Sequence, residues 1–291
     1  MIKTKYWIRA ARPQTLIASA APIIPVSILC LKNNSFNLNI FIVIFFSSLC
    51  IQIMTNFIND LYDYKKGADQ SDRIGPDRML QKGYLTEEQI KKGIFIVFIF
   101  ALISGFYLVN IGGYPIFLIG LSSFLFAYLY TATRMSISYN GLGELFVFSY
   151  FGIIASIGTY YLLTLQFNKD ALLIGSIAGC LNISLLVVNN LRDYKADIIS
   201  NKNTLIVIFG KKFGRIEFLF MLIIPYILLY FLLHHLNKSY AFFWYIPLMI
   251  FTVKLIYSVF SSDKFIQSKA FPCLSLYITL FIMLLSSIIY L

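Results

Sequence analysis

The sequence predicts an all-α membrane protein of nine transmembrane helices, and three observations support this prediction. Hydrophobic residues make up 59% of the 291 residues and charged residues only 13%, whereas soluble domains carry about 25% charged residues. The apolar residues form continuous runs of the roughly 20 residues that a membrane-crossing helix needs, without the alternation of barrel strands. The basic residues also gather beside every second gap between these runs.

Nine apolar runs are candidate spans. They cover residues 14–31, 40–62, 93–111, 114–132, 144–165, 171–193, 216–234, 241–260 and 270–290. The first is the weakest, because Pro22 and Pro25 interrupt it. Residues 1–13 are basic but are not followed by the short apolar stretch and small-residue cleavage site of a signal peptide. We therefore expect a single transmembrane domain over residues 1–291.

The placement of the basic residues predicts the orientation of the chain. The net charge is +11, and 21 of the 24 Lys and Arg residues fall on one side of the bilayer when residues flanking the spans are included. That side is formed by the N-terminus and by the loops 63–92, 133–143, 194–215 and 261–269. Because basic loops remain in the cytoplasm, we expect this side to be cytoplasmic. Membrane topology thus explains the basic charge, and we expect no nucleic-acid partner.

The cysteines and histidines offer little for metal or triad chemistry. The four cysteines lie in or beside spans without paired spacing, as buried thiols do. The only histidines, His234 and His235, lie at the predicted external end of the seventh span. A zinc site or a histidine-based triad is therefore not predicted.

Six of the 13 acidic residues lie in two stretches, 56–73 and 189–197, at the predicted cytoplasmic ends of the second and sixth spans. Residues three, four or seven apart share one face of a helix. The second span therefore projects Asn56, Asp60 and Asp63 together, and the sixth projects Asn189, Asp193 and Asp197. Asn-x-x-x-Asp occurs in both, with Asp60 and Asp193 lying 133 residues apart. A weak internal repeat that converges on one site explains this spacing.

Such carboxylates repel each other, and they are poorly solvated at a membrane boundary. A hard divalent cation offsets this, because Mg²⁺ binds one or two carboxylates together with water and phosphate oxygens. Nearby cations would meet the remaining charge of a diphosphate: Lys65, Lys66, Arg73, Arg78, Lys195 and Lys202. For either acidic group alone, simple ion pairing with these cations in wet loops is an equally good explanation.

The two acidic groups resemble the Asp-rich motifs of the UbiA superfamily of intramembrane aromatic prenyltransferases. Four further stretches resemble the branch of that superfamily that prenylates 1,4-dihydroxy-2-naphthoate. They are Ala11-Arg12-Pro13-Gln14-Thr15, Lys66-Gly67-Ala68-Asp69 with Arg73-Ile74-Gly75-Pro76-Asp77-Arg78, Gln81-Lys82-Gly83, and Tyr139-Asn140-Gly141-Leu142-Gly143-Glu144. The resemblance covers about residues 7–215. It implies a helical bundle around a central cavity in the bacterial cytoplasmic membrane, with 63–92 and 194–215 as cytoplasmic active-site loops.

The resemblance also implies a reaction and a set of site residues. A polyprenyl group would pass from polyprenyl diphosphate to the naphthoate ring, with loss of its carboxylate, to give demethylmenaquinone. Mg²⁺ would be held by Asp60, Asp63, Asp193 and Asp197, with Asn56 as a further catalytic residue. Substrate would contact Arg12, Lys65, Asp69, Arg73, Arg78, Arg134, Tyr139, Asn189, Lys195 and Lys202. Membrane lipid would surround the prenyl tail.

One position departs from the branch, and two other functions stay open. After the second acidic group the branch usually has Gly-Lys-Arg-Thr-Leu, whereas this chain has Asn201-Lys202-Asn203-Thr204-Leu205. The acceptor could therefore be a different one, such as 4-hydroxybenzoate, haem or a lipid headgroup. A cation-coupled transporter is a weaker alternative, because transporters place their charges near the bilayer midplane.

Overall fold

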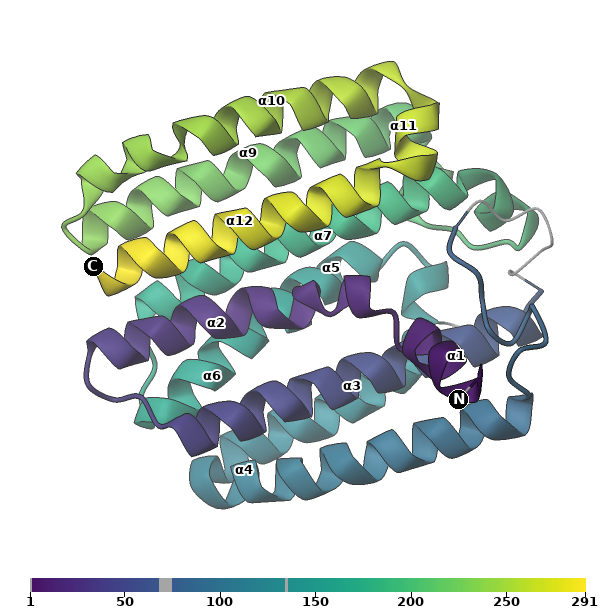
Figure 1. Cartoon of the computed structure of the whole chain (residues 1–291), viewed down its shortest axis with the longest axis horizontal. Helices are drawn as coiled ribbons and strands as arrows, with labels where there is room; N and C mark the ends of the chain where they lie inside the picture. The colour runs from purple at the N-terminus through teal and green to yellow at the C-terminus, as the bar shows by residue number, and fades with distance from the viewer. Residues whose placement is uncertain (1, 68–74, 134–135) are drawn as a thin grey trace.

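The computed structural model describes residues 2–67, 75–133 and 136–291, and within these ranges all regular structure is helical. The helices are α1 (Ile2–Ala11), α2 (Ile17–Lys32), α3 (Leu38–Lys65), α4 (Glu87–Leu129), α5 (Gly143–Phe148), α6 (Ala155–Thr164), α7 (Lys169–Ile199), α8 (Leu205–Phe209), α9 (Lys211–His235), α10 (Ile246–Ser261), α11 (Asp263–Ser268) and α12 (Ala270–Tyr290). A π-helical segment, Ser149–Ile154, joins α5 to α6. The long helices run side by side, with α7, α9, α10 and α12 in one half of the bundle and α2 to α6 in the other (Figure 1).

Among the described residues, seven helices are long and apolar enough to cross a membrane, and the bent pair Thr4–Thr15 and Ile17–Lys32 makes an eighth. The predicted count of nine is therefore not confirmed. The difference lies in α4, which has 43 residues and holds two of the predicted spans. Its helical geometry breaks at Gly113 (φ 63°, ψ −149°), two residues before Pro115.

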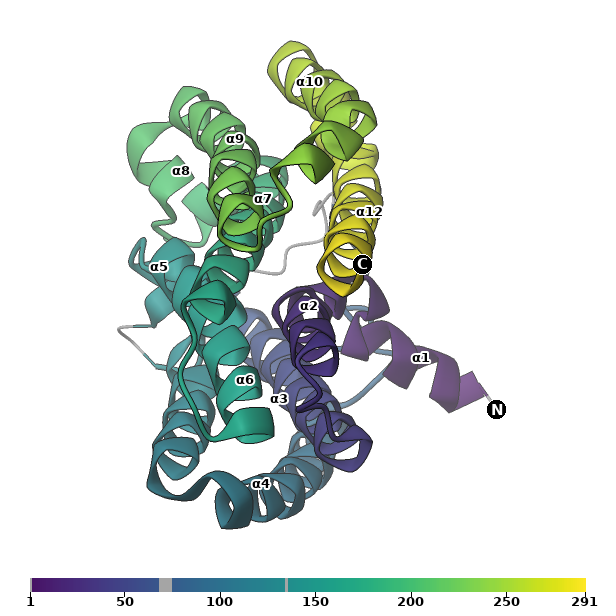
Figure 2. The same cartoon turned by 90° about the vertical axis from the view of Figure 1, so that its left-hand side faces the viewer.

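The two limbs of α4 run in opposite directions. At its start, Glu87 lies 3.4 Å from the Lys65 ammonium. Just beyond its end, the carbonyl of Thr131 accepts a hydrogen bond of 2.6 Å from Lys66. Both ends of α4 therefore meet the last turn of α3, and the chain reverses at Gly113 in between (Figure 2).

The first predicted span is helical across both prolines, and at Pro22 a neighbouring helix repairs the broken hydrogen-bond ladder. Pro22 has no N–H group and so cannot pair with the carbonyl of Ala18 four residues earlier. Asn182 of α7 is only 2% exposed and donates hydrogen bonds to that carbonyl (2.9 Å) and to the carbonyl of Phe151 in the π-helical segment (2.6 Å). In a membrane such repair is essential, since no water reaches the carbonyl.

Helix α7 is the central helix of the bundle. Of its most apolar 18-residue stretch, 78% is buried, compared with 17% for α4. It packs tightly against the π-helical segment at glycines: a Cβ on Gly152 would lie 2.6 Å from the carbonyl oxygen of Gly175 and 2.7 Å from the Cα of Gly179. Small residues at such a crossing let two membrane helices approach at backbone distance. This packing places the end of α7 beside the segment that follows α4.

The predicted cytoplasmic loops are shorter than expected, because their polar residues continue the helices. Helix α3 runs to Lys65 and α7 to Ile199, so both acidic groups lie within final helical turns. Helix α4 begins with a capping box between Thr86 and Gln89.

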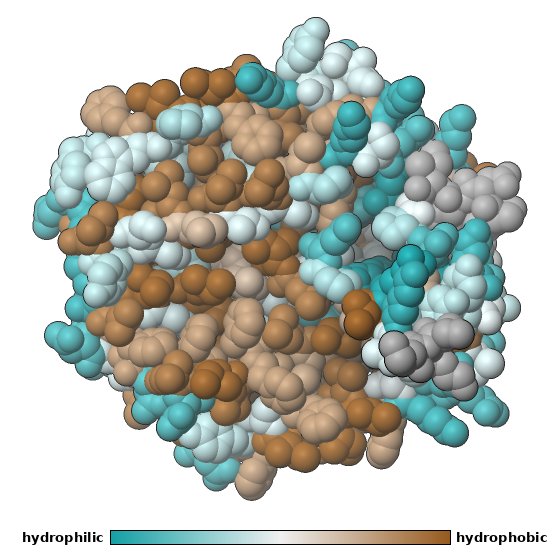
Figure 3. Space-filling view, in the orientation of Figure 1, coloured by the Kyte–Doolittle hydropathy of each residue, from teal (hydrophilic) through white to brown (hydrophobic). Residues whose placement is uncertain are grey.

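A hydrophobic belt covers the middle of the molecule, and hydrophilic side chains gather at one end (Figure 3). This end carries the last turns of α3 and α7 with Asp60, Asp63, Asp193 and Asp197. We call it the acidic end. The peripheral helix α1 also lies there (Figure 1), where the Trp7 ring contacts Phe57 at 5.5 Å between centroids.

Candidate functional site

The acidic group of α3 is enclosed by protein. Asp60 is 2% exposed and Asp63 is 5% exposed. Arg78, from the segment before α4, lies 3.2 Å from an oxygen of Asp63 and 3.9 Å from an oxygen of Asp60. Buried carboxylates three residues apart require such a counter-charge, because each is removed from water beside a like charge. The predicted grouping of Asp60, Asp63 and Arg78 is thus present.

Tyr139 joins the two acidic groups. Its hydroxyl donates a 3.0 Å hydrogen bond to the second oxygen of Asp63. Its backbone carbonyl accepts a hydrogen bond from the amide of Asn203, just beyond α7 (3.2 Å). The Lys202 ammonium lies 5.6 Å from the centre of the Tyr139 ring and 3.8 Å from Asp197. Residues far apart in the sequence, from the ends of α3 and α7, therefore meet around one phenol ring.

At the end of α7, Asp193 is held by its sequence neighbour. The Nε and one terminal nitrogen of Arg192 each donate a 2.8 Å hydrogen bond to Asp193. Gly75 packs against this guanidinium, since a Cβ added there would lie 3.1 Å from it. Gly75 and Arg78 belong to one short segment, so this segment connects the arginine of the α7 end with the aspartates of the α3 end.

Asn56 holds a turn beside the site, and its predicted catalytic role stays a prediction. Its side-chain amide donates to the carbonyl of Ala11 (2.9 Å) and to the hydroxyl of Thr15 (3.2 Å). These contacts hold the turn between α1 and α2, where Arg12 adopts a left-handed conformation with φ 54°. In this structure Asn56 thus fixes the backbone that carries Arg12.

Two residues at this end, Asn59 and Arg192, were not among the predicted site residues, and Lys66 was predicted only as a nearby cation for the diphosphate. Lys66 donates to the segment after α4 and lies 4.1 Å from the centre of the Tyr139 ring. Asn59 accepts a hydrogen bond from the hydroxyl of Thr131, and Arg192 binds Asp193 as described above. The spacing carried a signal for two of them: Asn59 and Lys66 lie four residues before and three after Asp63, on the same helix face.

Burial and neighbouring charges shift the pKa of Lys66, beside the Tyr139 ring. Partial burial lowers the pKa of Lys66 from its ordinary value, Asp63 raises it, and the nearby charge of Lys202 lowers it further. Two ammonium groups, Lys66 and Lys202, therefore lie close enough to act on each other beside Tyr139. Such a concentration of positive charge is suited to an anion with more than one charge.

The other predicted residues are less tightly placed. Lys65 is exposed and pairs with Glu87 at 3.4 Å. Lys195 is exposed and Asn189 is half-buried, one turn before Asp193. Asp69, Arg73 and Arg134 lie outside the described residues, and their assignment stays a prediction.

The residues fit a divalent metal only in combination with further ligands. Within the described ranges, no three His, Cys, Asp or Glu side chains come together as a ready-made metal site. Two pairs of carboxylates are present instead, Asp60 with Asp63 and Asp193 with Asp197. Mg²⁺ commonly takes one or two carboxylates and completes its octahedron with water and substrate phosphate. The donor set therefore matches Mg²⁺ bound together with a diphosphate.

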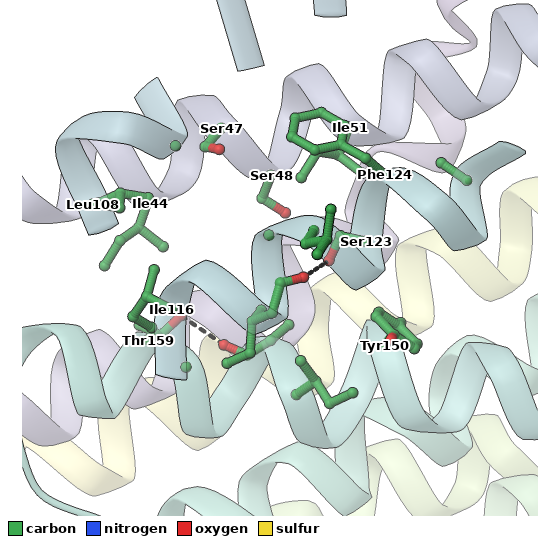
Figure 4. Close-up of a pocket in the computed structure, with 18 of the residues that line it drawn as sticks. Ile44, Ser47, Ser48, Ile51, Leu108, Ile116, Ser123, Phe124, Tyr150 and Thr159 are labelled. Carbon is green, nitrogen blue, oxygen red and sulfur yellow. Dashed lines mark hydrogen bonds between the residues drawn. The ribbon is translucent and has the colours of Figure 1, made fainter. Parts of the chain in front are cut away.

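An apolar cavity of about 770 Å³ lies within the bundle, and its lining reaches Thr55, five residues before Asp60 on α3. Figure 4 shows its lining by Ile44 and Ile51 of α3, Ile116 and Phe124 of α4, and Thr159 of α6. Thr55, beside Asn56, also lines it, as does Ser19 at the start of α2.

The cavity is open along α4, where lining side chains such as Phe106 (71%) and Ile103 (63%) are exposed. A hydrocarbon chain can therefore occupy the cavity and continue into lipid.

Comparisons with known proteins agree with this arrangement. The model of the UbiA prenyltransferase family matches residues 19–288. The chain is 33% identical over 222 residues to the 1,4-dihydroxy-2-naphthoate octaprenyltransferase of Haemophilus influenzae, a match that covers 74% of this chain and 72% of the relative. The enzyme of the same name from Escherichia coli K12 is 31% identical over 219 residues, with 73% and 71% covered.

Two solved structures share the fold. A UbiA homolog from Archaeoglobus fulgidus bound to GPP and Mg²⁺ superposes with a TM-score of 0.66 at 15% identity, over 98% of this chain and 100% of that chain. A structure of digeranylgeranylglyceryl phosphate synthase in membranes gives a TM-score of 0.65 at 18% identity, over 100% and 99%. The similarity extends over the whole described bundle.

Proposed function

Because the chain belongs to the UbiA prenyltransferase family, we propose that it transfers a polyprenyl group from polyprenyl diphosphate to 1,4-dihydroxy-2-naphthoate, with loss of the ring carboxylate, to give demethylmenaquinol, the hydroquinone form of demethylmenaquinone. We place this activity in one transmembrane domain, residues 1–291, of a bacterial cytoplasmic membrane. The N-terminus and the loops 63–92 and 194–215 face the cytoplasm in this proposal.

The observation that carries the proposal is the junction of two environments. At the acidic end, Lys66 and Lys202 lie beside the Tyr139 ring, Arg78 pairs with the α3 carboxylates, and Arg192 pairs with Asp193. The cavity that begins at Thr55 is lined mainly by apolar side chains. A polyprenyl diphosphate has the same division, with a charged head and a hydrocarbon tail. The head fits the acidic end together with Mg²⁺, and the tail fits the cavity and the adjoining lipid.

The side chains have separate roles in the reaction. Asp60, Asp63, Asp193 and Asp197 would hold Mg²⁺, which supplies positive charge that stabilises the departing diphosphate. Lys202 and Arg78 lie at the same end and would contact the diphosphate oxygens. The C1–O bond breaks with its electron pair on the diphosphate, which leaves an allylic cation at the mouth of the cavity. The tyrosine ring of Tyr139 is close enough to the cations of this site to stabilise positive charge by cation–π contact.

The acceptor then captures the allylic cation. The ring carbon that carries the carboxylate forms the new C–C bond, and the carboxylate leaves as carbon dioxide while its electron pair returns to the ring. No proton has to be added to that carbon. Arg12 and Arg134 are our candidates for contacting the acceptor carboxylate. The relatives from H. influenzae and E. coli, both named for this naphthoate, support the acceptor.

The proposal is tested by prenyl transfer in membranes that contain the expressed protein. Asp60→Ala and Asp193→Ala should each abolish transfer while the protein still inserts. Asp263→Ala is the matched control, because this aspartate is half-exposed on α11 and pairs with Lys211 and Arg215. Full activity of either site variant would overturn the assignment. Product mass spectrometry with naphthoate, 4-hydroxybenzoate, haem and lipid acceptors identifies the acceptor.

A further inference from the structure

Lys66 ends α3 three residues after Asp63, and its ammonium has all three of its donors engaged. It donates to the carbonyls of Thr131 (2.6 Å) and Thr133 (2.8 Å) and to the hydroxyl of Ser136 (3.0 Å). An ammonium group has three N–H donors and no acceptor. In this arrangement Lys66 therefore binds the chain segment after α4 and has no donor left for a substrate phosphate.

This segment is held along one face of α3. Asn59, Asp63 and Lys66 lie at positions i, i+4 and i+7 of the helix, so their side chains point the same way. Asn59 accepts from Thr131, Asp63 accepts from Tyr139, and Lys66 binds the residues between these two contacts. The three contacts together fasten Thr131, Thr133, Ser136 and Tyr139 to the last two turns of α3.

Lys66 also contacts Tyr139 directly. Its ammonium lies 4.1 Å from the centre of the Tyr139 ring, well within the range of a cation–π interaction. Tyr139 ends a short 3₁₀ turn, and its hydroxyl donates to Asp63. The position of that hydroxyl thus depends on a turn that directly follows Ser136, whose hydroxyl accepts a hydrogen bond from Lys66.

Resting on the proposed function, we propose that Lys66 is a positioning residue: it holds Tyr139 so that the phenol hydroxyl orients the Asp63 carboxylate for metal and diphosphate. Partners that orient a metal-binding carboxylate typically change metal affinity or activity about 10–100-fold when they are removed. The effect of Lys66 on the site should pass through Tyr139, and the alternative is a direct contact between Lys66 and the diphosphate.

A double-mutant cycle separates these two roles. Lys66→Met and Tyr139→Phe should each reduce kcat at saturating prenyl diphosphate by about 10-fold or more. The double variant should lose no more than the stronger single variant, because both remove the same orientation of Asp63. Independent losses that multiply would overturn the proposal. Lys212→Met is the charge-matched control, since Lys212 is exposed at the start of α9.

Metal binding gives a second measurement that does not use activity. Mn²⁺ affinity of the detergent-solubilised protein, measured by electron paramagnetic resonance with inorganic pyrophosphate, should fall by a similar factor in both single variants and in the double variant. Wild-type Mn²⁺ affinity in Lys66→Met, or a loss confined to pyrophosphate binding without metal, would overturn the proposal. If the wild-type protein binds Mn²⁺ and pyrophosphate but transfers no prenyl group, the proposed function fails and the positioning role of Lys66 does not.

Discussion

The acidic ends of α3 and α7 share the spacing Asn-x-x-x-Asp, but their carboxylates are held by different kinds of contact. At the α3 end, Asp63 is bound by Arg78 and Tyr139, which lie 15 and 76 residues away along the chain. At the α7 end, Asp193 is bound by the adjacent Arg192, and Asp197 is bound by Lys202 five residues later. One end is therefore assembled by tertiary structure, and the other by its own local sequence.

Because of this difference, changes in the connecting segments should affect the carboxylates of the two ends differently. The α3 carboxylates depend on the path of two connecting segments, so that any change in those segments alters their orientation. The α7 carboxylates keep Arg192 and Lys202 beside them as long as the helix end and the few residues after it are formed. If both pairs bind the same metal and diphosphate, they should still be equally necessary for the reaction.

The largest effect should come from neutralising one carboxylate at each end. Asp63→Asn and Asp197→Asn keep the side-chain shape and remove a charge that we assign to metal binding. Each should lower kcat on the order of 100- to 1,000-fold, as loss of one electrostatic contact to a developing charge does. Transfer assays across a Mg²⁺ titration, with EDTA as the metal-free limit, measure this. A large loss at one end only would show that a single pair holds the metal.

Replacing Arg78 and replacing Arg192 should destabilise the protein by different amounts, whereas the carboxylate substitutions at the two ends should reduce kcat by similar factors. Arg78→Met leaves Asp60 and Asp63 buried together without their common counter-charge, and breaking a buried ion pair costs about 3–5 kcal/mol. Arg192→Met affects one carboxylate and should cost roughly half as much by the same reasoning.

Thermal unfolding in detergent should therefore show a larger drop in Tm for Arg78→Met, and added Mg²⁺ should restore part of it by replacing the lost charge. Equal drops for the two variants would contradict the distinction between the two ends.

The sequence predicted the fold well at the level of individual helices. Run length and charge placement predicted the spans and placed both acidic groups at helix ends. They did not predict the boundaries, because residues such as Lys65 and Ile199 continue helices beyond the apolar runs. They also could not show that Asn182 repairs the break at Pro22, since this contact joins positions far apart in the chain.

For the candidate site too, the sequence predicted features within one helix but not the contacts between distant segments. The spacing of Asp60, Asp63, Asp193 and Asp197 identified the carboxylates. The partners of the α7 end are sequence neighbours and were within reach of the same reasoning. The contact of Tyr139 with Asp63 was not, because the route of the segment after α4 is set by packing against α3 and α7.

A single methyl group tests the connection between the two ends. A Cβ on Gly75 would lie 3.1 Å from the guanidinium of Arg192, so Gly75→Ala forces this flexible group to shift by a few tenths of an ångström. We expect a loss of kcat of about threefold, equivalent to roughly 0.6 kcal/mol of transition-state stabilisation. In an Arg192→Met background the same substitution should have no effect. A loss that persists there would place the role of Gly75 elsewhere.

The smallest effect should come from the position at which this chain departs from the related branch. Asn203 stands where that branch usually has Arg. Its side chain is exposed, and its backbone N–H donates a hydrogen bond to the carbonyl of Tyr139. Because the backbone contact does not depend on the side chain, Asn203→Arg should leave kcat unchanged. A new exposed cation near a charged ligand contributes about 0.2–1 kcal/mol and is screened by salt. We therefore expect the KM for prenyl diphosphate to fall by a few fold at low ionic strength, and the difference to vanish in high salt. A fall that survives high salt would mean that the new arginine reaches the buried part of the site.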